Sequence, residues 1–595
     1  MDDFIFGTLA TDEKRLAYLR AAWEGVTHRQ SREPRAPLPG QAFRLTLTTG
    51  PAYSGERAWV YWTTDGSDPA GEHGVATNGF AAPMTLTSAE WNVLVWDYIR
   101  HFEVTVPGQP DGTVLRYRLS AESPLAGEVF ADGGSYYACY IVDALTHGHP
   151  PEWAQDAVVY HIFVDRFFPG SGREWAQPVD PTGFYGGTLR GVLEKMDYLS
   201  ELGVSVLYLS PLFPSPSHHG YDSTELFEVE PRLGTKADLR ALLDETHRRG
   251  MHAILDFVPN HISNQHPLFI QAASDPLSPY HDWFTFGHWP DRYETFFGVR
   301  TLPQFNLRYP PARNYMLDVA RYWLEFGVDG YRVDYAIGPS PDFWADFRRV
   351  ALSTNPNCWT FGEVVDPPDV QRAFEGGLDG CLDFILLEAL RQSFAFGRWS
   401  PVRLAAFLNR HEAYFPSTFS RPSFLDNHDM NRFLWAANGD VRRLKLAALC
   451  QFSLVGPPII YYGTEVGLSQ ERDVRQADFG RPHESRLPML WGSQQKTMLF
   501  DYYQHLIALR RAHPALRRGA REVLFADSSA LAFTRGEDSD QVATALNLST
   551  DPVAVRLLRP FGQVLLATSP DCSSQSTTGE TLITLPPLGG LMLGR

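Results

Sequence analysis

The stretch Gly327-Val328-Asp329-Gly330-Tyr331-Arg332-Val333-Asp334-Tyr335-Ala336 decides the fold of this chain. A helical pattern over 315–326 leads into it, and the extended apolar run that follows predicts a buried strand. Side chains alternate along a strand, so Arg332 and Asp334 point to the same side. A guanidinium beside a carboxylate favours the ionised acid and fixes its orientation. Alone, the stretch leaves two interpretations open: a nucleophilic carboxylate at a strand end, or an ordinary ion pair with Asp334 capping the next helix.

Strand-like runs alternate with helical patterns on both sides of this stretch, from about residue 150 onward. Such alternation predicts parallel βα units, and eight of them make an α/β TIM barrel, (β/α)8, the economical fold. We expect helices at 189–202, 236–249 and 498–512. The expected strands are 158–163, 204–209, 253–258, the opening stretch, 359–363, 382–386, 422–425 and 458–462.

The segments before and after the predicted barrel contain short runs in which apolar and polar residues alternate. Runs at 43–47, 58–62, 102–106 and 115–119 predict an N-terminal antiparallel β-sandwich over 38–148, after a helix (13–23) and linker in 1–37. The barrel is expected at 149–515, and its long aromatic connection at 262–308 predicts a small inserted domain. Alternation returns over 523–593 and predicts a C-terminal β-domain at 516–595.

Composition narrows the classes of partner. The formal net charge of −17 argues against nucleic acid or an anionic membrane as a partner. No segment reaches the roughly 18 apolar residues of a membrane span, and the first residues lack a signal-peptide pattern. The 5 cysteines are scattered without metal-ligand spacing. We therefore expect reduced core thiols in a cytoplasmic protein.

Polar residues recur at the carboxyl ends of the predicted strands, where catalytic groups of TIM barrels lie. Asp256 ends the third strand, Glu363 the fifth, and Asp429 follows the seventh. Two acids on neighbouring strands suit a retaining glycosidase, whose carboxyl groups stand about 5 Å apart. Asp334 is then the nucleophile. Glu363, beside apolar residues that would raise its pKa, is the general acid.

The remaining polar residues at these strand ends suit sugar binding. Asp429 would hold ring hydroxyls and help to distort the sugar towards an oxocarbenium-like state. His261 and His428 can donate hydrogen bonds to hydroxyls without adding another anion.

Four segments resemble the conserved regions of the alpha-amylase family and occur in the family's order: 256–261 (DFVPNH), 330–334 (GYRVD), 362–364 (GEV) and 424–429 (FLDNHD). Segments 160–167, 203–212, 219–222 and 462–467 are similar too, so the resemblance spans about 157 to 515. It implies that Asp334 is the nucleophile, Glu363 the acid/base and Asp429 the transition-state stabiliser. It also implies that Arg332, His261 and His428 bind the sugar at the cleavage point.

The resemblance further implies that Tyr221 is a platform that stacks on this sugar; a packed core tyrosine is the alternative. Members of the family often bind calcium after the first strand through Asn and Asp. The segment 168–173 (FPGSGR) lacks both, so we predict no metal ion and no required cofactor.

Within the family, the N-terminal β-domain, the short inserted domain and the segments 186–191 (GGTLRG) and 302–306 (LPQFN) are similar to the branch of neopullulanase, cyclomaltodextrinase and maltogenic amylase. Two segments depart from it. After Asp334, 335–338 (YAIG) has neither the Lys-His of typical alpha-amylases nor the Asn-Glu of this branch. After Glu363, 364–366 (VVD) replaces a Trp-His pattern. Since these positions face the leaving-group sugars, they leave bond and substrate preference open.

The leading hypothesis is hydrolysis of α-1,4 glucosidic bonds, with α-1,6 bonds as further candidates, in maltodextrins, cyclodextrins or pullulan through a covalent glycosyl-enzyme. Transglycosylation through the same intermediate is the alternative. A relative that only binds glucan is the more distant one. By analogy with the same branch, we also keep the hypothesis of a homodimer formed through the N-terminal domain.

Overall fold

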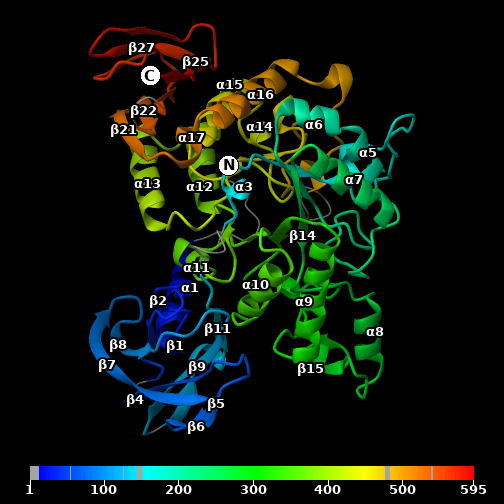
Figure 1. Ribbon diagram of the computed structural model, residues 1–595, viewed down its shortest axis with the longest axis vertical. Coiled ribbons are helices and arrows are strands. Elements are labelled where there is room, and N and C mark those ends of the chain that lie inside the picture. The colour runs from blue at the N-terminus through cyan, green and yellow to red at the C-terminus, as the bar shows by residue number, and fades with distance from the viewer. Residues whose placement is uncertain (1–11, 54, 125, 144–149, 476–482, 538–539) are drawn as a thin grey trace.

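The computed structural model describes residues 12–53, 55–124, 126–143, 150–475, 483–537 and 540–595. Figure 1 shows an N-terminal sheet domain (blue) at the lower left, a C-terminal sheet domain (red) at the upper left, and the barrel (cyan to yellow) beside both. Among the described residues, no helix is long and apolar enough to cross a membrane.

The expected (β/α)8 barrel is confirmed. Its parallel sheet has the order β19-β18-β17-β14-β13-β12-β20. The segment 420–423 closes the barrel between the two outer strands, because Ser420 bridges to Gly380 and Ser423 bridges to Pro458. The strands are β12 (Val159–Ile162), β13 (Val206–Leu209), β14 (His252–Phe257), β17 (Gly330–Val333), β18 (Trp359–Gly362), β19 (Gly380–Cys381) and β20 (Ile459–Tyr461).

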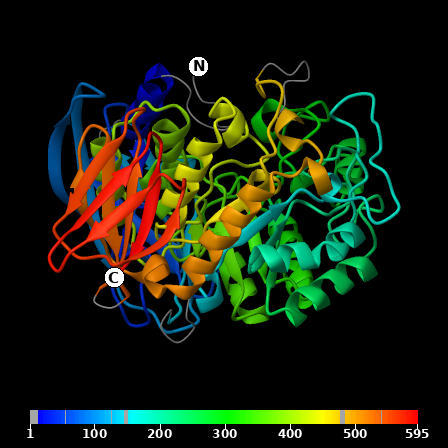
Figure 2. The ribbon, with the colours of Figure 1, turned by 90° about the horizontal axis from the view of Figure 1, so that it is seen from above.

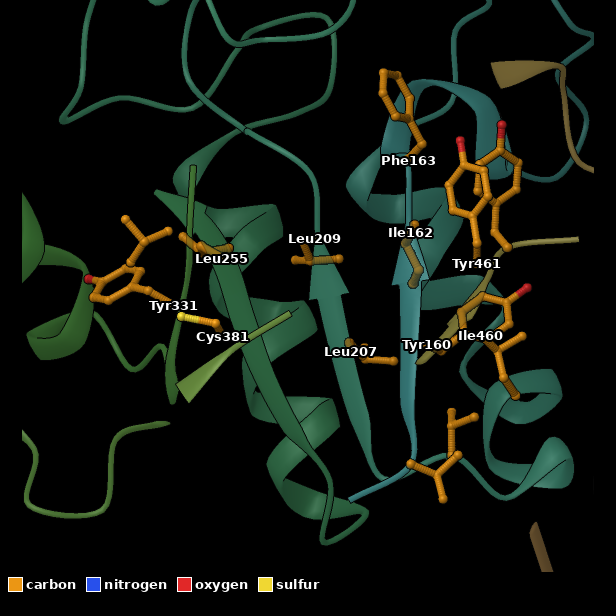
Figure 3. Packing of buried hydrophobic residues seen from close by; sticks show 14 of the residues in the cluster. Tyr160, Ile162, Phe163, Leu207, Leu209, Leu255, Tyr331, Cys381, Ile460 and Tyr461 are labelled. Atoms are coloured by element: carbon orange, nitrogen blue, oxygen red, sulfur yellow. The ribbon is translucent and has the colours of Figure 1, made fainter. Parts of the chain in front are cut away.

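Successive residues of the barrel strands face two different cores, as the two-residue period of a strand requires. Leu207, Leu209 and Leu255 belong to the layer between strands and helices, where Figure 3 shows them beside other apolar side chains. Val206 and Ile254, one position away, belong to the core inside the barrel. Strands buried on both sides read as continuous apolar runs, which is why the pattern predicted them.

Amphipathic helices cover the outside of the barrel. The helix α7 has a capping box in which the Thr235 hydroxyl accepts from the Asp238 N–H and the Asp238 carboxylate accepts from Thr235. The expected helix 189–202 is two helices, α5 and α6, that meet at Lys195. The helices are α3 (Glu152–Gln155), α4 (Val164–Phe167), α5 (Leu189–Glu194), α6 (Met196–Leu202), α7 (Lys236–Arg248), α9 (Pro310–Glu325), α10 (Phe343–Thr354), α11 (Pro368–Arg372), α12 (Phe384–Leu390), α13 (Pro401–Tyr414), α14 (Phe433–Ala436), α15 (Val441–Phe452), α16 (Thr497–Ala512) and α17 (Pro514–Arg518).

The sixth strand lies elsewhere than predicted. The strand β19 ends at Cys381, and α12 already begins at Phe384, so the expected strand at 382–386 is wrong. The Asp383 carboxylate accepts a hydrogen bond from the Leu386 N–H and starts this helix. A short buried helix has the same continuous apolar pattern as a buried strand, and the pattern alone does not separate them.

The long connection between β14 and β17 forms a small aromatic insertion. Trp283, Phe284 and Phe305 are buried in it, and Phe284 and Phe305 stack with ring centroids 5.4 Å apart. These side chains belong to the same hydrophobic core as the layer between the barrel strands and helices, so the insertion packs onto the barrel through them. Its elements are α8 (Pro267–Ser274), β15 (Phe286–His288), β16 (Arg292–Tyr293) and the short 3-10 helices η2 (His281–Trp283) and η3 (Phe296–Gly298).

The N-terminal domain is a folded antiparallel sheet in which β7 belongs to two halves. The first part of β7 pairs with β4 and its second part with β8, so that the halves enclose one core. The segment predicted as a linker contains two short strands, β1 and β2, that pair with β3. The elements are α1 (Asp12–Glu24), β1 (Val26–Thr27), β2 (Arg32–Glu33), β3 (Phe43–Thr49), β4 (Arg57–Thr63), β5 (Ala70–Glu72), β6 (Val75–Asn78), β7 (Phe80–Asn92), β8 (Asp97–Val106), β9 (Val114–Ser123), β10 (Gly127–Phe130) and β11 (Tyr137–Tyr140).

A buried ionic cluster joins this domain to the barrel. Arg116 of β9 lies 2.6 Å from Asp342 and 2.8 Å from Asp346, and Arg313 of α9 shares both acids. With Asp68 on Arg116 and Arg349 on Asp346, three arginines meet three carboxylates, so the charges balance. The boundaries predicted at 38, 149 and 516 stay predictions.

The C-terminal domain packs its sheets beside the barrel helices, as Figure 2 shows from above (red against yellow and orange). The first sheet has the order β21-β22-β23-β28-β25 and the second β24-β27-β26. Ser453, just after α15, is hydrogen-bonded to Thr544 of β23 at 2.9 Å. The strands are β21 (Arg521–Ala526), β22 (Ala530–Arg535), β23 (Val542–Asn547), β24 (Val553–Leu557), β25 (Gln563–Ala567), β26 (Ser573–Ser576), β27 (Thr581–Leu585) and β28 (Gly590–Gly594).

Candidate active site

Arg332 lies at the centre of three carboxylates at the carboxyl end of the barrel. Its Nη1 is 2.7 Å from Asp256 Oδ1 and 2.8 Å from Asp334 Oδ1, and its Nη2 is 2.7 Å from Glu363 Oε1. The parallel register produces this arrangement, because Asp256 of β14 lies directly beside Arg332 of β17. The expected pair of Arg332 and Asp334 is therefore part of a four-residue cluster. Of its members, Glu363 keeps the most exposed side chain, at 13%.

One guanidinium cannot neutralise three carboxylates in a buried site. Burial raises the pKa of Glu363, Arg332 opposes this rise, and Asp429 adds to it. Burial also raises the pKa of Asp334, again opposed by Arg332, while Glu363 adds to the rise. Ionisation of either group thus disfavours ionisation of the other, and the two acids compete for a proton. Such a pair can present one ionised and one protonated carboxyl group at once.

Asp429 lies in a contrasting environment. Its Oδ2 is 2.9 Å from His428 Nε2, and its Oδ1 accepts a hydrogen bond of 2.9 Å from Arg486 Nη2. Burial alone would raise the pKa of Asp429, but His428 and Arg486 outweigh burial and hold the pKa well below its usual range. Asp429 therefore stays ionised.

Arg486 is a site residue that the sequence did not indicate. It belongs to a 3-10 helix, η6 (His483–Arg486), in the irregular connection after β20. Its Nε donates to the His428 carbonyl at 2.8 Å, in addition to the contact with Asp429. No periodic pattern surrounds it, so no signal in the sequence placed it at this face of the barrel.

Tyr221 is fixed at its hydroxyl. The hydroxyl donates to Asp256 Oδ2 at 2.7 Å and lies 2.7 Å from His428 Nε2. The Tyr221 ring is nearly parallel to that of His428, with centroids 5.4 Å apart, and the residue is partly exposed. The Tyr208 hydroxyl also donates to Asp256 Oδ2, at 2.7 Å. With Arg332 on its other oxygen, Asp256 is fully engaged as a positioning residue.

His261 lies at the same face with one free nitrogen. Burial lowers its pKa to about 3, so the ring is neutral, and the main chain of Tyr221 is a neighbour. The ring stacks on Phe296 with centroids 4.4 Å apart. Among the residues described, none is hydrogen-bonded to its Nε2. A buried ring nitrogen without a partner is suited to a hydrogen bond with a ligand.

The segment after Asp334 forms one wall of the site together with the insertion. Tyr335 has a left-handed φ of 41° and packs edge-on against Phe296, with centroids 4.9 Å apart. A Cβ at Gly338 would lie 2.1 Å from Asn260 Oδ1, so this approach requires glycine. Ile337 is 41% exposed. The segment 335–338, one of the two that depart from the family branch, is thus a tight turn with one exposed apolar side chain.

Within the described part of the chain, no group of three or more His, Cys, Asp or Glu side chains could hold a metal ion. The expectation of a site without metal or cofactor stays a prediction.

Comparison with known proteins gives the family. The model of the alpha-amylase catalytic domain matches residues 161–519. Alpha-amylase 2 of Dictyoglomus thermophilum is 35% identical over 462 residues, 77% of this chain and 79% of that protein. Neopullulanase 2 of Thermoactinomyces vulgaris is 34% identical and covers 74% of this chain and 78% of its own. A solved cyclomaltodextrinase superposes with a TM-score of 0.69 at 26% identity over 96% of this chain and 99% of that one. The chain is a glycosidase that belongs to the alpha-amylase family.

Proposed function

We propose that this enzyme is a retaining hydrolase of α-1,4 glucosidic bonds, with α-1,6 bonds as further candidates, in maltodextrins, cyclodextrins or pullulan. The observation that carries the proposal is the position of Asp334 and Glu363 on the two terminal nitrogens of Arg332, at 2.8 and 2.7 Å. Two carboxyl groups that contact the same guanidinium suit attack by one of them on the sugar, as in a retaining mechanism.

In the first step, Glu363 donates its proton to the glycosidic oxygen, and an Asp334 oxygen forms a bond to the anomeric carbon as the bond to the leaving sugar breaks. In the second step, water gives a proton to the Glu363 carboxylate and its oxygen bonds to the anomeric carbon. The bond to Asp334 breaks as this new bond forms, so that both acids return to their starting states. The raised pKa of Glu363 supports its role as acid in this cycle.

The remaining residues act on the sugar at the cleavage point. Asp429, ionised beside Arg486, would bind ring hydroxyls and favour the positive charge that develops on the ring. His428 and His261 would bind hydroxyls, and the partly exposed Tyr221 ring would stack on the sugar. Arg332 holds both catalytic carboxyl groups in place. It would bind the sugar at the cleavage point next to these two groups.

The names of the relatives support the substrate class, since one is a neopullulanase and a structural neighbour is a cyclomaltodextrinase. Both are hydrolases, so transglycosylation is not favoured. The inactive alternative would need a missing acid, and Asp334, Glu363 and Asp429 are all present.

The proposal also includes three further properties: no required cofactor or calcium, a homodimer formed through the N-terminal domain, and a cytoplasmic location without a nucleic-acid or membrane partner. Five buried cysteines, all free thiols, support a reducing compartment.

Product analysis on maltotriose, β-cyclodextrin, pullulan and starch tests the substrate class, and NMR of the first product tests the stereochemistry. We expect sugars with the α-configuration at the new reducing end before mutarotation. Initial release of the β-anomer would exclude a retaining mechanism, and longer oligomers at high maltotriose would favour transfer over hydrolysis.

A further inference from the structure

A cavity of about 220 Å³ lies at the opposite end of the barrel from the candidate active site. Its wall combines segments that precede barrel strands, such as Gly456 before β20, with parts of α13, α17, β21 and β22. Figure 1 shows α13, α17, β21 and β22 gathered where the barrel meets the C-terminal domain. The cavity is therefore a feature of the junction between two domains.

Arginine dominates the charged lining of this cavity. Arg421, Arg517, Arg521 and Arg535 line it, and Glu412 is the one acid among the described lining residues. Arg521 and Arg535 are almost inaccessible, with side chains 1% and 2% exposed. Such a cluster is unexpected in a chain with a net charge of −17, whose surface as a whole repels anions.

Neighbouring acids do not balance the cluster. Glu412 accepts from Arg521 Nε at 3.1 Å and from Arg535 Nη1 at 3.5 Å. Arg517 pairs with Asp156, which Arg518 shares. Arg421 is 3.6 Å from Asp383, an acid that His411 also engages.

With Arg510 behind the wall, five guanidinium groups meet three carboxylates: Glu412, Asp156 and Asp383. Arg510 itself donates only to main-chain carbonyls, such as that of Leu454 at 2.8 Å. Burial, and then the like charges of Arg535 and Arg517, lower the pKa of Arg510 to about 9. Two positive charges are left without a described counter-charge.

Hydrogen bonding is incomplete in the same place. Arg517 Nε, Arg521 Nη1 and Arg535 Nε are buried, and no described residue accepts from them. Water could satisfy such donors but would not offset two buried positive charges. A small dianion with several oxygens would satisfy both requirements, because guanidinium groups match phosphate in charge and geometry.

We propose that this cavity binds phosphate, either as the inorganic ion or as the phosphate group of a small monoester. The volume is below the roughly 300 Å³ of the smaller drug-sized ligand sites, so a polymer such as nucleic acid does not fit. The site would join α13 of the barrel to α17, β21 and β22 through one ligand. It lies away from the strand ends that carry Asp334 and Glu363 and is independent of the proposed function.

Calorimetric titration of the full chain with inorganic phosphate and with glucose 6-phosphate tests the proposal, at constant ionic strength and with glucose as the neutral control. We expect saturable binding near one ligand per chain for at least one of the two phosphates, and for glucose only binding at the candidate active site, which Arg517→Gln leaves unchanged. A monoester bound tenfold tighter than phosphate would identify a phosphate ester as the ligand, and equal affinity would identify the inorganic ion. Absence of saturable binding of both would overturn the proposal.

Adjacent arginines on α17 supply a matched pair of variants. Arg517 lines the cavity and Arg518 does not, although both pair with Asp156. We expect Arg517→Gln to weaken phosphate binding about tenfold or more, since it removes a charge-assisted donor, and Arg518→Gln to change it less than twofold.

Glu412→Gln should have the opposite effect on phosphate binding to that of Arg517→Gln. It removes the acid of the lining, so phosphate binding should become about tenfold tighter. Equal weakening by Arg517→Gln and Arg518→Gln, with no gain from Glu412→Gln, would assign the binding to general surface charge and contradict a built site.

Discussion

The two ends of the barrel carry buried ionic clusters of opposite composition. At the carboxyl end, Arg332 meets the carboxylates of Asp256, Asp334 and Glu363; at the amino end, Glu412 meets Arg521 and Arg535. Excess carboxylates can bind a proton, and burial raises the pKa of Glu363 accordingly. Excess guanidinium groups cannot lose theirs near neutral pH. The carboxylate-rich cluster can therefore reduce the size of its net charge by binding a proton, as acid–base chemistry requires. The arginine-rich cluster can reduce the size of its net charge only by binding an anion.

The largest expected effect comes from the carboxylate that we assign as nucleophile. Asp334→Asn should lower kcat on maltotriose by roughly 10⁴-fold or more, because the covalent intermediate can no longer form. Binding of substrate should change far less. Steady-state kinetics and isothermal titration with the inactive variant measure the two effects separately.

Azide rescue distinguishes Asp334 from Asp256, which shares Arg332 Nη1 with it. In Asp334→Ala, azide should enter the vacated space and give a β-glycosyl azide at a measurable rate. Asp256→Ala should show no rescue, since Asp256 is enclosed by two tyrosine hydroxyls. Rescue of both variants, or of Asp256→Ala alone, would refute the assignment.

The second largest effect is expected from Glu363, the acid of the carboxylate-rich cluster that we expect to be protonated. Glu363→Gln should lower kcat on maltotriose by roughly 10²- to 10⁴-fold, the range of general acid–base catalysis. Because Glu363 must be protonated to act and its pKa is raised, wild-type activity should fall as the pH rises through that raised pKa. The variant should lose this alkaline limb in a pH–rate profile.

A substrate with a good leaving group serves as the internal control. Formation of the glycosyl-enzyme from a dinitrophenyl α-maltoside needs little protonation of the leaving oxygen. The pre-steady-state burst of Glu363→Gln with this substrate should therefore stay close to that of the wild type. A burst slowed as much as the maltotriose reaction would show that Glu363 is not the acid.

A smaller effect is expected from Arg486, which, with His428, lowers the pKa of Asp429 and so keeps this carboxylate ionised. Arg486→Lys retains the charge but cannot bind both Asp429 Oδ1 and the His428 carbonyl as the guanidinium does. We expect a loss in kcat of about tenfold with KM within twofold, measured on maltotriose. Arg442→Lys, at an exposed pair with Asp440, is the matched control and should be neutral. A change in KM alone would contradict a positioning role.

The contrast between the clusters also explains what the sequence could predict. Asp334 and Glu363 were predictable as neighbours, because their strands are adjacent and catalytic groups gather at one end of a TIM barrel. The contact of Arg332 with Asp256 depends on the register between their two strands. The apolar pattern of a strand does not determine this register. Arg486 and the arginines of the cavity come from irregular connections or from two domains, so only the packed fold brings them together. The sixth strand was misplaced because a buried helix starting at Asp383 has the apolar pattern of a strand.

The smallest expected effect compares the two clusters directly, through thermal unfolding of Glu363→Gln and Glu412→Gln. A carboxyl group with a raised folded-state pKa contributes full stability below its unfolded pKa, and this contribution is lost as pH rises through the folded value. Glu363→Gln should therefore match the wild type at pH 4 and unfold roughly 1–3 °C higher at pH 7 to 8. Glu412→Gln leaves Arg521 and Arg535 without their shared carboxylate and should unfold a few degrees lower at pH 7. If the unfolding temperatures of both variants shifted equally and in the same direction, the two clusters would not differ in the way that we propose.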